Sequence, residues 1–254
     1  MQKILSIFLV LLLAACSSTT QTTSGRSYLD RHYVSSSNKQ DGAKTEGFSL
    51  EEAILKAAAV EPALKFPARI GIARIKNRGL GAISGEEVAQ WKELQAKLGA
   101  SFGEFIPVNP ITADIASAQA QIDAKSQIDP ISKIRLGAAR QHLDAVFIYE
   151  VYNDENSEAN LLSIANITII GAYILPSNRV NVKSYANGIL IDVIQGYPYG
   201  TAEAFVEKDS LTSRNFKSEK RRNLRSEGEV EAVHKLAIEA EEMFKNLRGE
   251  LANK

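Results

Sequence analysis

The sequence contains few of the residue types that most often carry chemistry. Among its 254 residues there are one cysteine, one tryptophan, two methionines and three histidines. A single cysteine excludes an internal disulfide, a CxxC redox pair and a cysteine-based zinc site. Acidic and basic residues balance at 30 each, so no overall field attracts nucleic acid, and we expect no nucleic-acid partner.

Motifs for catalysis and metal binding are also missing from the sequence. It has no HExxH, GxSxG or P-loop pattern. The histidines, His32, His142 and His234, have no Glu or His at metal-ligand spacing. The sequence therefore predicts no catalytic residue, no metal and no free cofactor, and we expect the protein not to be an enzyme.

The sequence does contain a short leader at its start. A basic residue, Lys3, precedes an apolar stretch from Ile4 to Leu13, which is too short to cross a hydrocarbon core of roughly 30 Å. Leu13-Ala14-Ala15-Cys16 resembles the bacterial lipobox. This resemblance implies that residues 1–15 are a signal peptide and that Cys16 becomes the lipidated first residue.

The lipid on Cys16 implies a location for the protein. A diacylglyceryl group and an amide-linked acyl chain together exceed what stable membrane anchoring requires. Ser17 follows Cys16, and a residue other than Asp at this position is typical of outer-membrane cargo in Gram-negative bacteria. We therefore expect a protein anchored to the outer membrane by the lipid on Cys16, with its domain facing the periplasm.

A polar segment separates the lipidated residue from the rest of the chain. Residues 17–24 read SSTTQTTS, and polar composition continues to Gly47. Such a sequence buries too little apolar surface to offset its ordering entropy, which predicts a flexible tether over residues 16–47 with a reach of about 30 Å. Residues 48–254 are expected to form a single periplasmic domain.

Within this domain the hydrophobic period changes along the chain. Helical patterns alternate with strands first, and strands with short turns follow, which predicts a mixed α/β fold: a mixed β-sheet with an antiparallel meander in the C-terminal half and helices packed on it. The expected helices are 49–60, 84–99, 112–126, 129–141 and 227–251, the strands 68–75, 102–108, 143–152, 161–175, 179–194 and 201–207, and the loops 153–160 and 208–225.

Three segments are similar to a group of periplasmic lipoproteins. They are residues 134–148 (IRLGAARQHLDAVFI), 188–196 (GILIDVIQG) and 200–204 (GTAEA). These segments resemble the domains of the curli secretion channel lipoprotein and of the lipoprotein activators of penicillin-binding proteins. With the lipobox and the length, they are most similar to the rhombotarget lipoproteins, although residues 247–254 lack the Gly-Gly motif, apolar span and basic tail of members cut by rhombosortase.

The resemblance implies a domain that works by binding another envelope protein or copies of itself. Channel-forming relatives insert long hairpins into the membrane, and 161–194 is long enough to consider. Because Arg179, Asn181, Lys183 and Asn187 share one face of its second strand, we favour a soluble sheet core.

One glycine-rich segment allows a different function. Gly79, Gly81 and Gly85 follow an expected strand and precede a helix, where backbone N–H groups can hold a phosphate. Their GxGxxxG spacing departs from the dinucleotide pattern GxGxxG, and glycine also permits a simple turn. A nucleotide-binding enzyme acting through 79–85 therefore remains an alternative.

Two surface features are candidate partner-binding residues. Tyr197-Pro198-Tyr199 places two aromatic rings at a turn, which makes Tyr197 and Tyr199 a candidate hot spot. Lys220, Arg221 and Arg222 lie in the most basic stretch of the chain, suited to anionic groups. For the two tyrosines the alternative is ordinary packing within the turn. For the basic stretch the alternative is a solvated loop.

The sequence therefore predicts a non-enzymatic, lipid-anchored binding or assembly module for an envelope protein partner. The alternative is a subunit of an oligomeric outer-membrane export complex.

Overall fold

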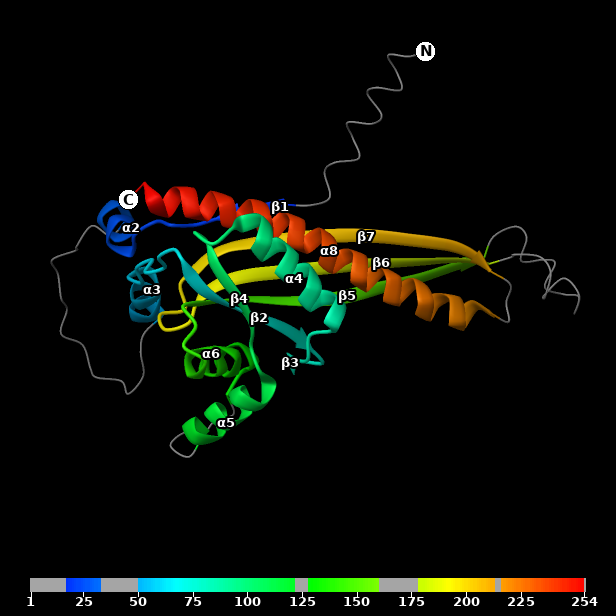
Figure 1. The fold of residues 1–254 in the computed structure, drawn as a ribbon, viewed down its shortest axis with the longest axis horizontal. Helices are drawn as coiled ribbons and strands as arrows, with labels where there is room; N and C mark the ends of the chain where they lie inside the picture. Colours follow the sequence, from blue (N-terminus) through cyan, green and yellow to red (C-terminus); the bar gives the residue numbers. More distant parts are fainter. Residues whose placement is uncertain (1–16, 33–49, 122–127, 160–177, 213–215, 254) are drawn as a thin grey trace, which may run out of the picture.

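In a computed structural model of the chain, the described residues are 17–32, 50–121, 128–159, 178–212 and 216–253. They form a seven-stranded mixed sheet with helices on both faces (Figure 1). The strands are β1 (Ser17–Thr20), β2 (Ala68–Lys76), β3 (Gly79–Gly81), β4 (Gly103–Pro107), β5 (Ala145–Ala159), β6 (Asn178–Asp192) and β7 (Pro198–Thr212), and the helices α2 (Gly25–His32), α3 (Leu50–Ala58), α4 (Gly85–Leu98), α5 (Pro110–Gln121), α6 (Pro130–Arg140) and α8 (Lys217–Ala252).

The sheet combines parallel and antiparallel pairs. The strand order is β1-β7-β6-β5-β2-β3, and β4 also pairs with β2. β2 runs parallel to β4 and β5, whereas β5, β6 and β7 form an antiparallel meander. The predicted fold class is therefore confirmed.

Two hydrophobic cores lie on opposite faces of this sheet. On one face, Trp91 of α4 and Phe244 of α8 pack with strand residues such as Phe147, with ring centroids 5.4 to 5.9 Å apart. On the other face, Ile134 of α6 packs against Val146 and other buried strand residues. The long strands extend past α5 and α6 while α8 follows them (Figure 1).

The helix starts follow their capping residues. The Ser84 hydroxyl accepts from the backbone N–H of Glu87 at 3.2 Å and begins α4. Asp129 accepts from the N–H groups of Ile131 and Ser132 at 3.0 Å, and Pro130 occupies the first turn of α6. Both of these predicted boundaries are confirmed.

Two expected loops are wrong. Residues 153–159 continue β5, because their backbone pairs with β6 in unbroken register and Asn153 finds side-chain partners on β6 and α8. Residues 208–212 continue β7, and α8 begins at Lys217, ten residues before the expected start. Leu224 is buried with Val182, which holds this charged first part of α8 on the sheet. The expected strand 161–175 lies outside the described residues.

The N-terminal segment also differs from the expected tether. Ser17–Thr20 pair antiparallel with β7, from Glu203 to Gly200, and Gly25–His32 form α2. The polar side chains do not prevent this, because strand pairing uses the backbone and β7 offers it an edge. Cys16 and residues 33–49 lie outside the described residues, and the division of the chain into leader, tether and domain stays a prediction.

Candidate functional site

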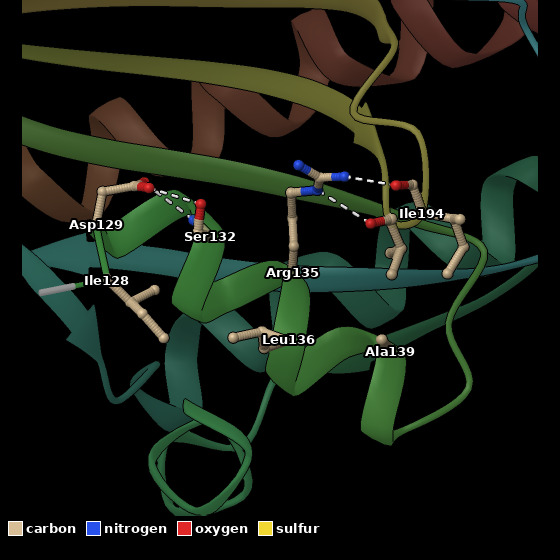
Figure 2. A pocket seen from close by; sticks show the side chains of 8 residues that line it. Ile128, Asp129, Ser132, Arg135, Leu136, Ala139 and Ile194 are labelled. Carbon is tan, nitrogen blue, oxygen red and sulfur yellow. Dashed lines mark hydrogen bonds between the residues drawn. The ribbon is translucent and has the colours of Figure 1, made fainter. Parts of the chain in front are cut away.

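The turn between β6 and β7 is held rigidly by buried polar groups. Asp192, 5 % exposed, accepts from the backbone N–H groups of Ile194 and Gln195 at 2.8 and 2.7 Å. Arg135 of α6 donates through Nε to the Val193 carbonyl at 3.0 Å and through Nη2 to the Ile194 carbonyl at 2.7 Å, as Figure 2 shows. The guanidinium of Arg135 therefore fixes the position of residues 193–194.

This turn carries the most exposed large apolar side chain of the described residues. Ile194 is 76 % exposed. A groove of about 570 Å³ lies between it and α6 (Figure 2). The lining residues are Ile128, Asp129, Ser132, Arg135, Leu136, Ala139, Val193 and Ile194.

The charge of Asp129 in this groove is stabilised locally. Hydrogen bonds from the Ser132 hydroxyl and from the backbone N–H groups of the first turn lower the pKa of the Asp129 carboxyl. Asp129 and Arg135 are therefore engaged by α6 and the turn, and the groove offers both polar and apolar contact.

A second groove, of about 920 Å³, lies on the other side of the same turn. Residues 195–198 form one wall of this groove, and α2 and α3 supply others, including Tyr28 and Ile54. These two side chains are 46 % and 56 % exposed, and Leu50 at the start of α3 is 72 % exposed. The turn is thus an apolar ridge between two grooves, and we call residues 193–196 the ridge.

The candidate hot-spot residues Tyr197 and Tyr199 are both buried, at 4 % and 0 % exposure, so their rings are not available to a partner at this surface. Tyr197 donates its hydroxyl to the Thr23 carbonyl at 2.7 Å. The Tyr199 hydroxyl accepts from the N–H groups of Ala63 and Leu64 at 3.0 and 2.7 Å. Both tyrosines therefore hold segments from the N-terminal part of the chain against the turn. The structure thus agrees with the alternative interpretation, in which the two rings pack within the turn.

Burial sets the acidity of the two phenols. Burial raises the pKa of Tyr199 to about 12, although the two N–H donors oppose the shift. Burial likewise raises the pKa of Tyr197. Both hydroxyls stay protonated at neutral pH and act as fixed hydrogen-bonding groups.

The basic candidates lie on α8 at the other end of the sheet from the ridge (Figure 1). Arg222 is exposed, whereas Lys220 and Arg221 are half-buried. The structure therefore does not bring them together with Tyr197 and Tyr199, and their role in partner binding stays a prediction.

The glycine-rich segment forms a β-hairpin. Asn77 and Arg78 have φ of 52° and 63°, and Gly79–Gly81 pair antiparallel with residues 74–76. A two-residue turn with positive φ at both positions joins antiparallel strands directly. Gly79 and Gly81 therefore lie in a strand, not in the expected loop, and nucleotide binding through 79–85 stays a prediction.

A buried ionic cluster joins the sheet to α4 and α8. Arg74 contacts Glu87 and, at 3.1 Å, Glu229, and the Tyr149 hydroxyl donates to Glu87 at 2.7 Å. Burial alone would raise the pKa of Glu229, but hydrogen bonds from Arg225, Asn153 and Arg74 hold it lower. The charged groups face one another, so the cluster clamps helices to the sheet.

Among the residues that the structure describes, no group of three His, Cys, Asp or Glu side chains is placed to hold a metal ion. The apolar ridge was missed in the sequence. Its only sequence signal is Ile194, an apolar residue directly before Gln195-Gly196.

No protein family matches this chain, and no curated protein is similar to it in sequence. Solved structures with partial similarity include a PelC dodecamer from Paraburkholderia phytofirmans (13 % identity, 69 % of this chain and 93 % of that chain, TM-score 0.29). Others are lipoprotein GNA1162 from Neisseria meningitidis (11 %, 63 % and 97 %, 0.30) and the LpoB C-terminal domain from Escherichia coli (15 %, 57 % and 86 %, 0.28). These TM-scores are low.

Proposed function

We propose that the protein is a lipid-anchored lipoprotein of the outer membrane whose periplasmic domain is a non-enzymatic binding or assembly module. The observation that carries the binding role is the ridge, where a rigid turn holds Ile194 76 % exposed between two grooves. Exposed apolar side chains gathered around grooves, here Ile194 with Tyr28 and Ile54 of the second groove, favour a partner-binding role. A partner would cover Ile194 and fill the grooves.

The anchor is supported by the position of Cys16 in the sequence. The next residue, Ser17, is paired with Glu203 of β7, so lipid chains on Cys16 would hold the sheet edge close to the bilayer. Anchoring also raises the local concentration of the domain, which allows a weak interface to act. Within the described ranges, no helix is both long and apolar enough to span a bilayer.

The anchor is tested by Cys16→Ser. We expect the wild-type chain in the membrane fraction and the variant in the soluble periplasmic fraction, with mass spectrometry showing acyl chains on the wild-type Cys16 only. Retention of Cys16→Ser in the membrane fraction, or an unmodified thiol in the wild-type chain, would contradict the anchor.

The binding role is tested by photo-crosslinking in cells. A photoreactive residue replaces Ile194 in one variant and Ile238 in a control, since Ile238 of α8 is exposed at 48 % but lies away from the ridge. We expect position 194 to capture a discrete envelope protein and position 238 not to. Equal capture from both positions, or none from position 194, would argue against the ridge as the interface.

A further inference from the structure

Among the described residues, part of the sheet is left uncovered on the side opposite α8, and we call it the open face. Asn153 and Ser184 point to α8, where Asn153 donates to Glu229 at 2.9 Å. Because side chains alternate along a strand, the adjacent Tyr152 and Tyr185 point the other way. On that side α6 contacts β2, β3 and β5, and the strands continue past it (Figure 1).

An aromatic row crosses this open face. Tyr152, Tyr185 and Phe205 are directly opposite one another in the registers of β5, β6 and β7. Each ring centroid is 5.0 Å from the next, and the planes of the two tyrosines differ by 9°. Tyr152 ends the row and is 47 % exposed, so another group can stack on this ring.

Carboxylates flank the aromatic row. One step toward the body of the sheet, Glu150 and Glu203 lie on either side of Asn187. One step the other way, Glu207 lies opposite Lys183. The three carboxylates are in exposed residues, whereas Lys183 is half-buried. We call this surface the aromatic–acidic patch; it comprises Glu150, Tyr152, Lys183, Tyr185, Asn187, Glu203, Phe205 and Glu207.

The opposite face of the same strands carries a basic segment. Residues 217–225 of α8 include two lysines and three arginines but one acid, Glu219. Leu224 packs with Val182, which places this segment on the α8 side of β6. Within one molecule the sheet separates the basic segment from the aromatic–acidic patch, so the two cannot meet.

We propose that the basic segment 217–225 of one molecule docks on the aromatic–acidic patch of a second copy of this chain. An arginine such as Arg222 can stack on the ring of Tyr152 while its guanidinium pairs with Glu150, two residues away on β5. Other cations of the segment then pair with Glu203 and Glu207 on β7. The chain itself supplies both complementary surfaces, which is the reason to assign a second copy as the occupant.

The two surfaces differ and lie on opposite faces, so the contact is heterologous. After a single contact, one molecule keeps a free patch and the other keeps a free basic segment, so further copies build a ring or an open chain. This inference goes beyond the proposed function, since it needs neither the lipid nor the ridge.

Sedimentation velocity of the full-length protein in a nonionic detergent tests the proposal. We expect oligomers at about 50 mM salt that dissociate at about 500 mM, since salt screens exposed charges. Glu203→Lys and Arg222→Glu should each weaken self-association by about tenfold or more. The matched controls Glu242→Lys and Lys92→Glu make the same charge changes at exposed positions of α8 and α4 and should leave it unchanged.

Mixing the two interface variants provides the decisive measurement. In a mixture, the unaltered helix of Glu203→Lys meets the unaltered patch of Arg222→Glu, and the two reversed surfaces also match. We therefore expect the mixture to regain the association that each variant lacks alone. A monomer at low salt, variants that associate like the wild type, or a mixture as weak as its components would overturn the proposal. The Cys16→Ser and position 194 experiments test the proposed function separately.

Discussion

At the scale of single residues, the Tyr199 hydroxyl links three parts of the chain. It accepts from the N–H groups of Ala63 and Leu64 and donates to Asp192 Oδ2 at 3.1 Å. The sequence made Tyr199 a candidate binding residue because it lies at a turn. The burial of Tyr199 depends on residues more than a hundred positions away, which no local pattern contains.

We predict that Tyr199→Phe lowers the free energy of unfolding by about 1–3 kcal/mol at neutral pH. The substitution leaves the N–H group of the buried Leu64 without an acceptor, which costs about 1–3 kcal/mol, whereas water can replace the acceptor at the exposed Ala63. Urea denaturation measures the effect. Tyr152→Phe is the matched control, and this exposed ring should change stability by no more than about 0.5 kcal/mol.

The same pair of variants has a second readout at high pH. The pKa of Tyr199 is raised from 10.0 to about 12 in the folded protein. The stabilisation by the protonated phenol is therefore complete below pH 10 and is lost as the pH rises toward 12, because the unfolded chain releases its proton first. Tyr199→Phe should lose less stability over this interval than the wild type. Equal losses in both proteins would contradict the role of the buried phenol.

At the scale of elements, close approach between helices depends on glycine. Gly137 of α6 faces α5, and an added Cβ would lie 2.6 Å from the Ala113 Cβ and 2.9 Å from its Cα. The two helices cannot keep this spacing if a larger residue replaces Gly137, because the added atom would meet the backbone of Ala113 as well as its side chain. Helical periodicity predicted both helices, but it could not predict which of their faces meet.

We predict that Gly137→Ala destabilises the protein by about 1–3 kcal/mol, measured by chemical denaturation. The control is Gly249→Ala in α8, where an added Cβ meets nothing within 4 Å. That change should stabilise by up to about 1 kcal/mol, because alanine is the better helix former. Stabilisation by both substitutions would show that α5 and α6 are not in tight contact.

Element boundaries also show what the sequence can predict. The starts of α4 and α6 follow from Ser84 and Asp129, whose side chains bond N–H groups two or three residues away. Such caps are local, so the sequence contains them. The extension of β5 through residue 159 is not local, because its pairing partner is β6.

At the scale of the whole molecule, the N-terminal segment joins both ends of the chain. β1 pairs with β7, and the Thr20 and Thr22 hydroxyls donate to the Glu250 carboxylate of α8 at 2.5 and 3.0 Å. The Ser24 hydroxyl donates to Glu61 at 3.0 Å. The segment is thus part of the folded body.

We predict that deletion of residues 17–24 lowers the free energy of unfolding by about 3 kcal/mol. Several hydrogen bonds at about 1 kcal/mol each are lost, and for a protein of this size each kcal/mol lowers Tm by about 2–4 °C. Differential scanning calorimetry should show a fall of about 6–12 °C, and removal of Asn253 and Lys254 should show none. A deletion without effect on Tm would support the flexible tether instead.

The sequence by itself determined the mixed α/β class, the helix caps and the candidate anchor at Cys16, because hydrophobic period, capping and lipobox are each read within a few adjacent residues. Only the tertiary structure decided that Ser17–Thr20 and residues 153–159 are strands, that Tyr197 and Tyr199 are buried, and that Ile194 is exposed between two grooves. The physical reason is that backbone pairing and burial are set by partners far away in the chain, and a polar segment forms a strand wherever such a partner offers it an edge.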